Sequence, residues 1–191
     1  MKEGLILETP RLILREMTEA DVPAIHAWAG NPDNVTYMAW GPNSEEQTQW
    51  FVSHCIETAQ AEPRTKFDFV LQLKFTGQVI GSGGIYRKMD NYNRRFISGE
   101  VGWILHMDHW KQGYGSEFCA ALLRFGFEEL GLNRIYAHSD AENYGSYRIM
   151  ERNGMRREAV LKQEILGRDG SWHDGYVYAI LREEWDKKEL P

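Results

Sequence analysis

Cysteine, long apolar runs and an excess of positive charge are all scarce in this chain of 191 residues. The two cysteines, Cys55 and Cys119, fall within helical patterns, so we expect buried thiols in a reducing compartment rather than a disulfide. No apolar run approaches the roughly 20 residues that a membrane-spanning helix needs. No secretory hydrophobic region precedes Arg11. These features predict a cytoplasmic protein with no membrane partner.

The balance of charge is acidic, with 22 basic and 28 acidic residues and a formal net charge of −6. A protein that grips the nucleic-acid backbone needs a basic surface, so nucleic acid is not an expected partner. An acidic surface is compatible with a cationic substrate but does not require one. The length suits one domain with a full core, and we expect a single domain over residues 1–191.

Apolar periodicity and capping residues place the helices and strands along the chain. Predicted helices cover residues 19–30, 45–60, 114–131 and 143–154. Period-two segments predict strands over residues 11–17, 67–75, 78–86, 94–105, 133–139, 155–166 and 173–185. This order predicts an α/β (α+β) fold, in which about four helices flank a mixed, mostly antiparallel sheet of about seven strands.

Two glycines stand immediately before a strongly amphipathic helix in the segment QGYGSE. A helix start presents unpaired N–H groups, and a pyrophosphate binds well there. The amides expected to converge are those of Gln112, Gly113, Tyr114, Gly115 and Ser116. The segment is not a P-loop, because Gly-Lys-Ser/Thr does not follow, and it lacks the third glycine of a dinucleotide fingerprint. A plain tight turn is the alternative.

Four segments follow one another along the chain and carry a family resemblance: TPRLILRE (9–16), EVGWILHMDHWKQGYGSEF (100–118), NYGSYRIMERNGM (143–155) and HDGYVYAILREEW (173–185). Together they resemble the GCN5-related N-acetyltransferases (GNAT), specifically the RimJ/RimL-like branch of ribosomal-protein N-terminal acetyltransferases, over nearly the whole chain. The resemblance implies a single GNAT-fold domain, acetyl-CoA as cosubstrate, no metal, and transfer to a primary amine. The family's loop, Arg/Gln-x-x-Gly-x-Gly/Ala, falls on residues 110–115 and has Trp110 at its first position.

The resemblance also assigns the cofactor's pantetheine arm and sulfur to particular residues. The arm is expected to pair with the backbone of the strand before the glycine loop, at Trp103, Ile104 and Leu105. Asn143 would hydrogen-bond the arm, although it can also cap the following helix, and the two roles can coexist. Ser146 would lie near the sulfur. It is the candidate acid for the thiolate, because Met150 holds the position of the acid tyrosine in other GNAT enzymes.

Glu100 is the candidate general base, acting directly or through water. It lies in an otherwise apolar strand, on the same face as Gly102 and Ile104. The alternative is a structural carboxylate paired with Arg94 or Arg95. A weak or water-mediated base suits a protein N-terminal amine, with a pKa of about 7.7–8.0, better than a lysine at about 10.4.

The acceptor is expected in a cleft bordered by the loop between the first two helices, which carries Tyr37 and Trp40. A protein N-terminus is the first expected acceptor. A small-molecule amine (polyamine, amino acid, or antibiotic or toxin) and a non-catalytic CoA-binding regulatory module are the alternatives. His106, Asp108 and His109 fit no standard zinc pattern, so no metal is expected. The protein is expected to be a monomer or a homodimer.

Overall fold

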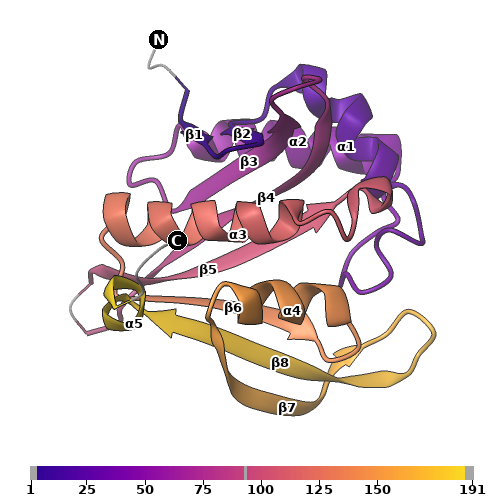
Figure 1. The fold of residues 1–191 in the computed structure, drawn as a ribbon. Coiled ribbons are helices and arrows are strands. Elements are labelled where there is room, and N and C mark those ends of the chain that lie inside the picture. Colours follow the sequence, from indigo (N-terminus) through magenta and orange to yellow (C-terminus); the bar gives the residue numbers. More distant parts are fainter. Residues whose placement is uncertain (1–3, 93, 188–191) are drawn as a thin grey trace.

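The computed structural model describes residues 4–92 and 94–187, and one eight-stranded sheet runs through this part of the chain (Figure 1). The strand order is β1-β2-β3-β4-β5-β6-β8-β7. The strands are β1 Ile6–Glu8, β2 Leu12–Arg15, β3 Lys66–Leu73, β4 Val79–Met89, β5 Phe96–Leu105, β6 Arg134–Asp140, β7 Arg156–Leu166 and β8 Trp172–Leu181. The helices are α1 Val22–Ala29, α2 Glu45–Ala59, α3 Tyr114–Arg124, α4 Tyr144–Arg152 and α5 Arg182–Asp186.

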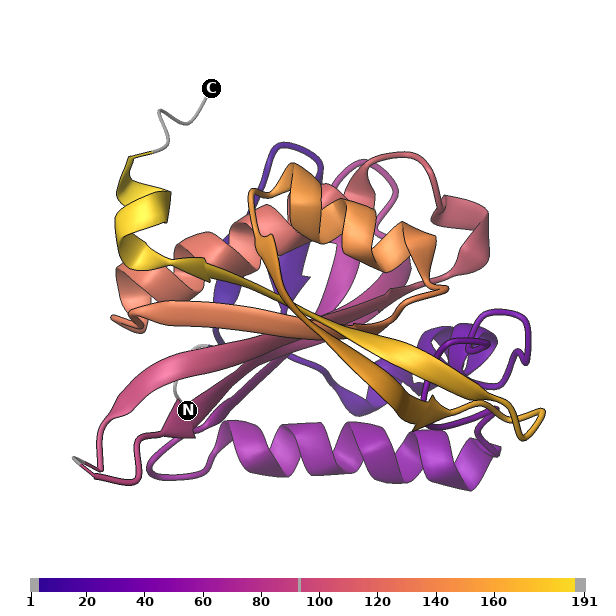
Figure 2. The same ribbon diagram turned by 90° about the horizontal axis from the view of Figure 1, so that it is seen from below.

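The sheet separates two layers of helices: α1 and α2 lie on one face, and α3 and α4 lie on the other (Figure 2). Strand β3 serves both layers because successive side chains point to opposite faces. Phe69 packs in the larger core with Phe118 of α3, while Val70 packs with Ile25 and Trp28 of α1. The predicted mixed α/β fold is therefore confirmed.

Local capping explains where the helices begin. The hydroxyl of Ser44 accepts a hydrogen bond from the backbone N–H of Gln47, at 3.2 Å, and the Gln47 side chain accepts one from the Ser44 N–H, at 2.8 Å. This capping box starts α2 as predicted. Asn143 caps α4, since its side-chain oxygen accepts from the Ser146 N–H at 3.1 Å. Gly113 is the residue immediately before α3, and its backbone has a left-handed conformation.

The parallel pair, β5 and β6, comes apart along its length. Their pairing begins at Ser98 with Arg134 and ends at Glu100 with Tyr136. Beyond that point β5 continues along β4 to Leu105, and β6 continues along β8. The two strands diverge, and α3 and α4 both begin near the open end (Figure 1). The facing edges of residues 101–105 and 137–140 are therefore not paired with each other.

Two elements differ from the sequence-based expectation. Strand β1 was not predicted, because three residues are too short for a period to show. Residues 182–186 form the helix α5 rather than the end of the last strand. The Glu184 carboxylate accepts a hydrogen bond from the Leu181 N–H at 2.8 Å, which satisfies the first turn of a helix where strand alternation would have continued.

Candidate active site

Gly113 and Gly115 meet two different steric demands at the start of α3. Gly113 has φ +84°, a conformation that side chains with a Cβ rarely adopt, and a Cβ there would lie 3.2 Å from Arg11 Nη2. A Cβ on Gly115 would lie 2.6 Å from Cδ1 of Ile149 on α4. Glycine at both positions therefore opens the helix start and lets α4 pack close beside it. This is more than a plain turn requires.

Residues 9–11 (Thr-Pro-Arg), near the N-terminus, hold this loop in place. The sequence alone did not indicate that role. The Thr9 hydroxyl donates to Glu117 Oε1 at 2.6 Å, and Arg11 Nε lies 2.6 Å from Glu117 Oε2. Arg11 Nη1 donates to the carbonyl of Gln112 at 3.0 Å, and its guanidinium lies over the Tyr114 ring. Burial alone would raise the pKa of Glu117, but hydrogen bonds from Thr9 and Arg11 lower it.

Trp110, which replaces the family's Arg/Gln, ties the glycine loop to the diverging strand. Its indole N–H donates to the carbonyl oxygen of Leu105 at 2.9 Å. Asn34 Nδ2 donates to the same oxygen at 3.0 Å, and Asn34 Oδ1 accepts from the Met107 N–H at 2.7 Å. The Leu105 carbonyl is therefore already engaged by two side chains.

A cavity of about 730 Å³ opens between the starts of α3 and α4, and we call it the cofactor cavity. Most of the predicted cofactor residues line it: Trp103, Ile104, Leu105, Gly113, Tyr114, Gly115, Ser116 and Asn143. Gln112 does not, since its side chain donates to the Asp108 carbonyl at 2.9 Å. Three basic side chains also line the cavity: Lys111, Arg148 and Arg152. Positive charge and a helix N-terminus suit a phosphate-bearing ligand.

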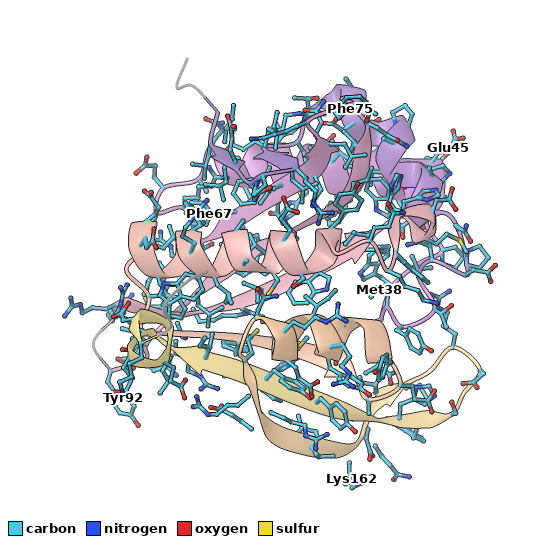
Figure 3. All side chains as sticks on the ribbon, viewed as in Figure 1. Met38, Glu45, Phe67, Phe75, Tyr92 and Lys162 are labelled. Atoms are coloured by element: carbon cyan, nitrogen blue, oxygen red, sulfur yellow. The ribbon has the colours of Figure 1, made fainter. Side chains whose placement is uncertain are left out.

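A second cavity, of about 720 Å³, extends beneath α1 and α2, and we call it the acceptor cavity. It is lined by the predicted substrate residues Tyr37 and Trp40 and by the predicted base Glu100. The two cavities share six lining residues: Tyr37, Met38, Trp103, Ile104, Asn143 and Ser146. These shared residues form the junction of the cavities. Figure 3 shows Met38 on the side of the molecule where α3 and α4 begin.

Glu100 has a different partner from the one considered in the sequence. Its Oε2 lies 3.3 Å from Nζ of Lys88 on the neighbouring strand, rather than beside Arg94 or Arg95. The Glu100 side chain is 31% exposed, so the expected apolar surrounding is only partial. Ser146 lies on the other side of the junction, in the first turn of α4, and Met150 is buried one turn further along.

A buried pair at the base of the acceptor cavity escaped sequence analysis. The Tyr86 hydroxyl donates to Asp68 Oδ1 at 2.7 Å, and Asp68 is 8% exposed. Desolvation raises the pKa of Asp68, and the hydrogen bond from Tyr86 opposes that rise. Burial also raises the pKa of Tyr86. Alternation placed both residues on strands, but the register between β3 and β4 is what brings them together.

Residues 4–92 and 94–187 hold neither a metal-binding cluster nor a membrane-spanning helix. In that part of the chain, His, Cys, Asp and Glu form no group of three or more that could hold a metal ion. Within the same residues, every helix is too short or too polar to cross a membrane. Cys55 and Cys119 are buried thiols that are not joined in a disulfide, as predicted.

Comparison with known proteins identifies the family. The acetyltransferase (GNAT) domain matches residues 11–156. The uncharacterized N-acetyltransferase YnaD of Bacillus subtilis is 32% identical over 180 residues, which cover 94% of this chain and 99% of YnaD. The RimL ribosomal L7/L12 α-N-protein acetyltransferase in complex with coenzyme A superposes with a TM-score of 0.79 at 21% identity, over 93% of this chain and 98% of that one. The spermidine N-acetyltransferase of Vibrio cholerae in complex with CoA and spermine superposes with a TM-score of 0.78 at 22% sequence identity. The match covers 94% of this chain and 100% of that one. This chain therefore belongs to the GNAT family and is an acetyl-CoA-dependent N-acetyltransferase.

Proposed function

We propose that acetyl transfer takes place at the junction of the two cavities, with Glu100 as base and Ser146 as acid. The observation that carries this proposal is the set of six residues that line both cavities, because donor and acceptor must meet where their sites join. Tyr37 and Trp40 border the acceptor's path to this point.

The glycine loop and the diverging strand hold the donor in this proposal. Backbone N–H groups from Gly113 to Ser116 bind the diphosphate, and Lys111 adds positive charge. The free edge of β5 at Trp103 and Ile104 binds the pantetheine arm as an added strand would. Gln112 is left out of the diphosphate site, because it does not line the cofactor cavity and its side chain is bonded to Asp108.

Proton transfers accompany the exchange of bonds. As the amine nitrogen bonds to the acetyl carbon and the carbon–sulfur bond breaks, Glu100 takes the amine proton directly or through water. Ser146 gives a proton to the thiolate and regains one from solvent. Asn143 both caps α4 and faces the junction, so it fixes the orientation of the turn that carries Ser146.

Two acceptor classes suit this chemistry, and the cavity favours the second. A protein N-terminal α-amine, as in the RimJ/RimL-like branch, has a low pKa and needs only a weak base. Glu100, which is partly exposed and paired with Lys88, would be sufficient for it. A small amine matches an acceptor cavity that continues under α1 as far as Met17 and Ile25. The RimL and spermidine enzymes share this fold and are named for different acceptors, so the acceptor has to be argued from the cavity itself. We place the small amine first.

An acetyl-CoA consumption assay tests the proposal, with N-terminal peptides beside small amines at equal concentration. Acetylation of small amines alone supports the first choice, and acetylation of peptides alone supports the RimJ/RimL-like alternative. A protein that binds acetyl-CoA but releases no thiol with either panel is a non-catalytic CoA-binding module, and that result contradicts the proposal. A cytoplasmic location and a monomeric or homodimeric state stay predictions.

A further inference from the structure

The two cavities differ in the charge that lines them. The cofactor cavity has three basic side chains in its walls, Lys111, Arg148 and Arg152, and two acidic ones, Glu142 and Glu151. Three carboxylates line the acceptor cavity: Asp68, Glu100 and Asp140. Among the described residues that line the acceptor cavity, none is a lysine or an arginine. An anionic donor and a cationic acceptor would each find the complementary charge.

Two of the three carboxylates already have basic partners. Glu100 lies 3.3 Å from the Lys88 ammonium, and Asp140 Oδ2 lies 2.7 Å from Nδ1 of His173. The hydrogen bond that His173 donates to Asp140 raises the pKa of His173, as expected for an imidazole beside a carboxylate. These two carboxylates are therefore occupied by the protein's own groups.

Asp68 stands apart from them, because its hydrogen-bond donor is the neutral hydroxyl of Tyr86. No basic group among the described residues lies within 4.0 Å of its carboxylate. Lys66, two residues away on β3, points its ammonium to Nε2 of His54 at 3.1 Å instead. Lys66, Arg64 and His54 act on the Asp68 charge only from a distance, so a cationic ligand in contact with the carboxylate would offset much of the cost of its burial.

The surroundings of Asp68 suit an organic cation rather than a metal ion. Aromatic side chains of α1 and α2 line the acceptor cavity, among them Trp28, Trp50 and Phe51. Aromatic faces attract organic cations through their quadrupole. The buried hydroxyl of Ser139 lines the cavity on β6, which β4 and β5 separate from β3. It has no hydrogen-bond partner among the described residues, so a polar ligand group could satisfy it away from Asp68.

The sheet register sets the spacing between Asp68 and the reacting end of the cavity. Asp68 on β3 is opposite Gly84 on β4, and Tyr86 on β4 is opposite Glu100 on β5. Two strand spacings, about 10 Å, therefore separate the strands of the two carboxylates. A short diamine can bridge such a gap, with one nitrogen beside each carboxylate.

We propose that Asp68 anchors a second positive charge on the acceptor, so that the acceptor is a small organic dication such as an aliphatic diamine. One nitrogen binds Asp68 within the aromatic walls, and the other reaches Glu100 and Ser146 at the junction. The inference rests on the proposed function, because it concerns the acceptor of the same transfer.

The test compares 1,4-diaminobutane with n-butylamine, which has the same chain and one charge fewer. We expect the wild-type kcat/KM to favour the diamine by at least about tenfold, the scale of a hydrogen-bonded charge pair. Asp68→Asn keeps the shape and the acceptor for Tyr86 but removes the charge, and it should bring the ratio to within about threefold, mainly through KM. Asp186→Asn, an exposed change of the same charge on α5, should keep the wild-type ratio.

A wild-type enzyme that acetylates n-butylamine as well as the diamine overturns the inference. So does an Asp68→Asn variant that keeps the preference. Calorimetric titration of 1,4-diaminobutane into the CoA-loaded protein separates this inference from the proposed function, because it needs no turnover. A loss of diamine affinity of at least about tenfold in Asp68→Asn supports the anchor even if no amine is acetylated. Equal affinities in the two proteins overturn it.

Discussion

The indole N–H of Trp110 donates to the carbonyl oxygen of Leu105, at 2.9 Å. This contact joins the turn that leads into the glycine loop to the last residue of β5. It therefore couples the two surfaces that hold the donor, the amides at the start of α3 and the free edge of β5. The side chain that stands in for the family's Arg/Gln has a structural role of its own.

Replacing Trp110 should weaken coenzyme binding without removing it. Trp110→Phe keeps the aromatic bulk and deletes the N–H donor, while Asn34 still holds the Leu105 carbonyl. Loss of one hydrogen bond predicts about a two- to tenfold rise in the Kd for CoA by calorimetry. Trp172→Phe, an exposed position at the start of β8, is the control and should leave Kd unchanged. Equal affinity in the two variants would contradict the coupling.

Gly113 and Gly131 form a matched pair for testing the loop. Both have positive φ, +84° and +66°. Gly131 lies just past the far end of the helical segment that begins at Tyr114, and no atom of the described residues lies within 4 Å of a Cβ placed there. Alanine at either position should cost about 1–2 kcal/mol of unfolding free energy through backbone strain. Only Gly113→Ala should also lower CoA affinity, and Gly113→Asp should abolish it through like-charge repulsion. A Gly113→Asp protein that binds CoA normally would refute the assignment.

Glu100→Gln should lower turnover by about 100-fold, the scale of general-base catalysis, with little change in the Kd for acetyl-CoA. The loss should be greatest at low pH, because an amine that is already neutral at high pH needs no base. The pH profile of kcat/KM measures this directly. Glu57→Gln, an exposed change on α2, should behave as wild type. A Glu100→Gln profile parallel to the wild-type profile would place the base elsewhere.

The His173–Asp140 pair predicts a pH dependence of stability. The Asp140 hydrogen bond raises the pKa of His173 in the folded state. Because the pKa of His173 is higher in the folded state, the pair stabilises the folded protein fully below the unfolded-state pKa of about 6.5. This stabilisation is lost as the pH rises through the folded-state pKa. The Tm should therefore fall over that window in the wild type and fall less in His173→Gln. His138→Gln, an exposed neighbour on β6, should keep the wild-type slope, and identical slopes in all three proteins would rule the effect out.

Local signals predicted most of the fold, while contacts that depend on strand register did not show in the sequence. Ser44 and Asn143 carry their capping chemistry within three residues, and α2 and α4 begin where they indicate. The partner of Glu100 depends instead on how β4 pairs with β5: Glu100 is opposite Tyr86, and Lys88 lies two residues further along β4.

The acceptor cavity shows the same limit more sharply. Asp68 and Tyr86 are separated by 18 positions and meet across two strands. Neither Asp68 nor Tyr86, taken alone within its predicted strand, indicates a functional site. The glycine loop was found because helix-start chemistry is local, and Thr9 and Arg11 were not assigned a role because their partner Glu117 lies more than 100 positions away.

A crystal structure of the protein with CoA tests the central claim most directly. The account predicts the diphosphate within hydrogen-bond distance of the backbone N–H groups of residues 113–116, the arm along Trp103 and Ile104, and the sulfur beside Ser146. A diphosphate bound away from the start of α3, or a sulfur that does not reach the junction, would contradict it.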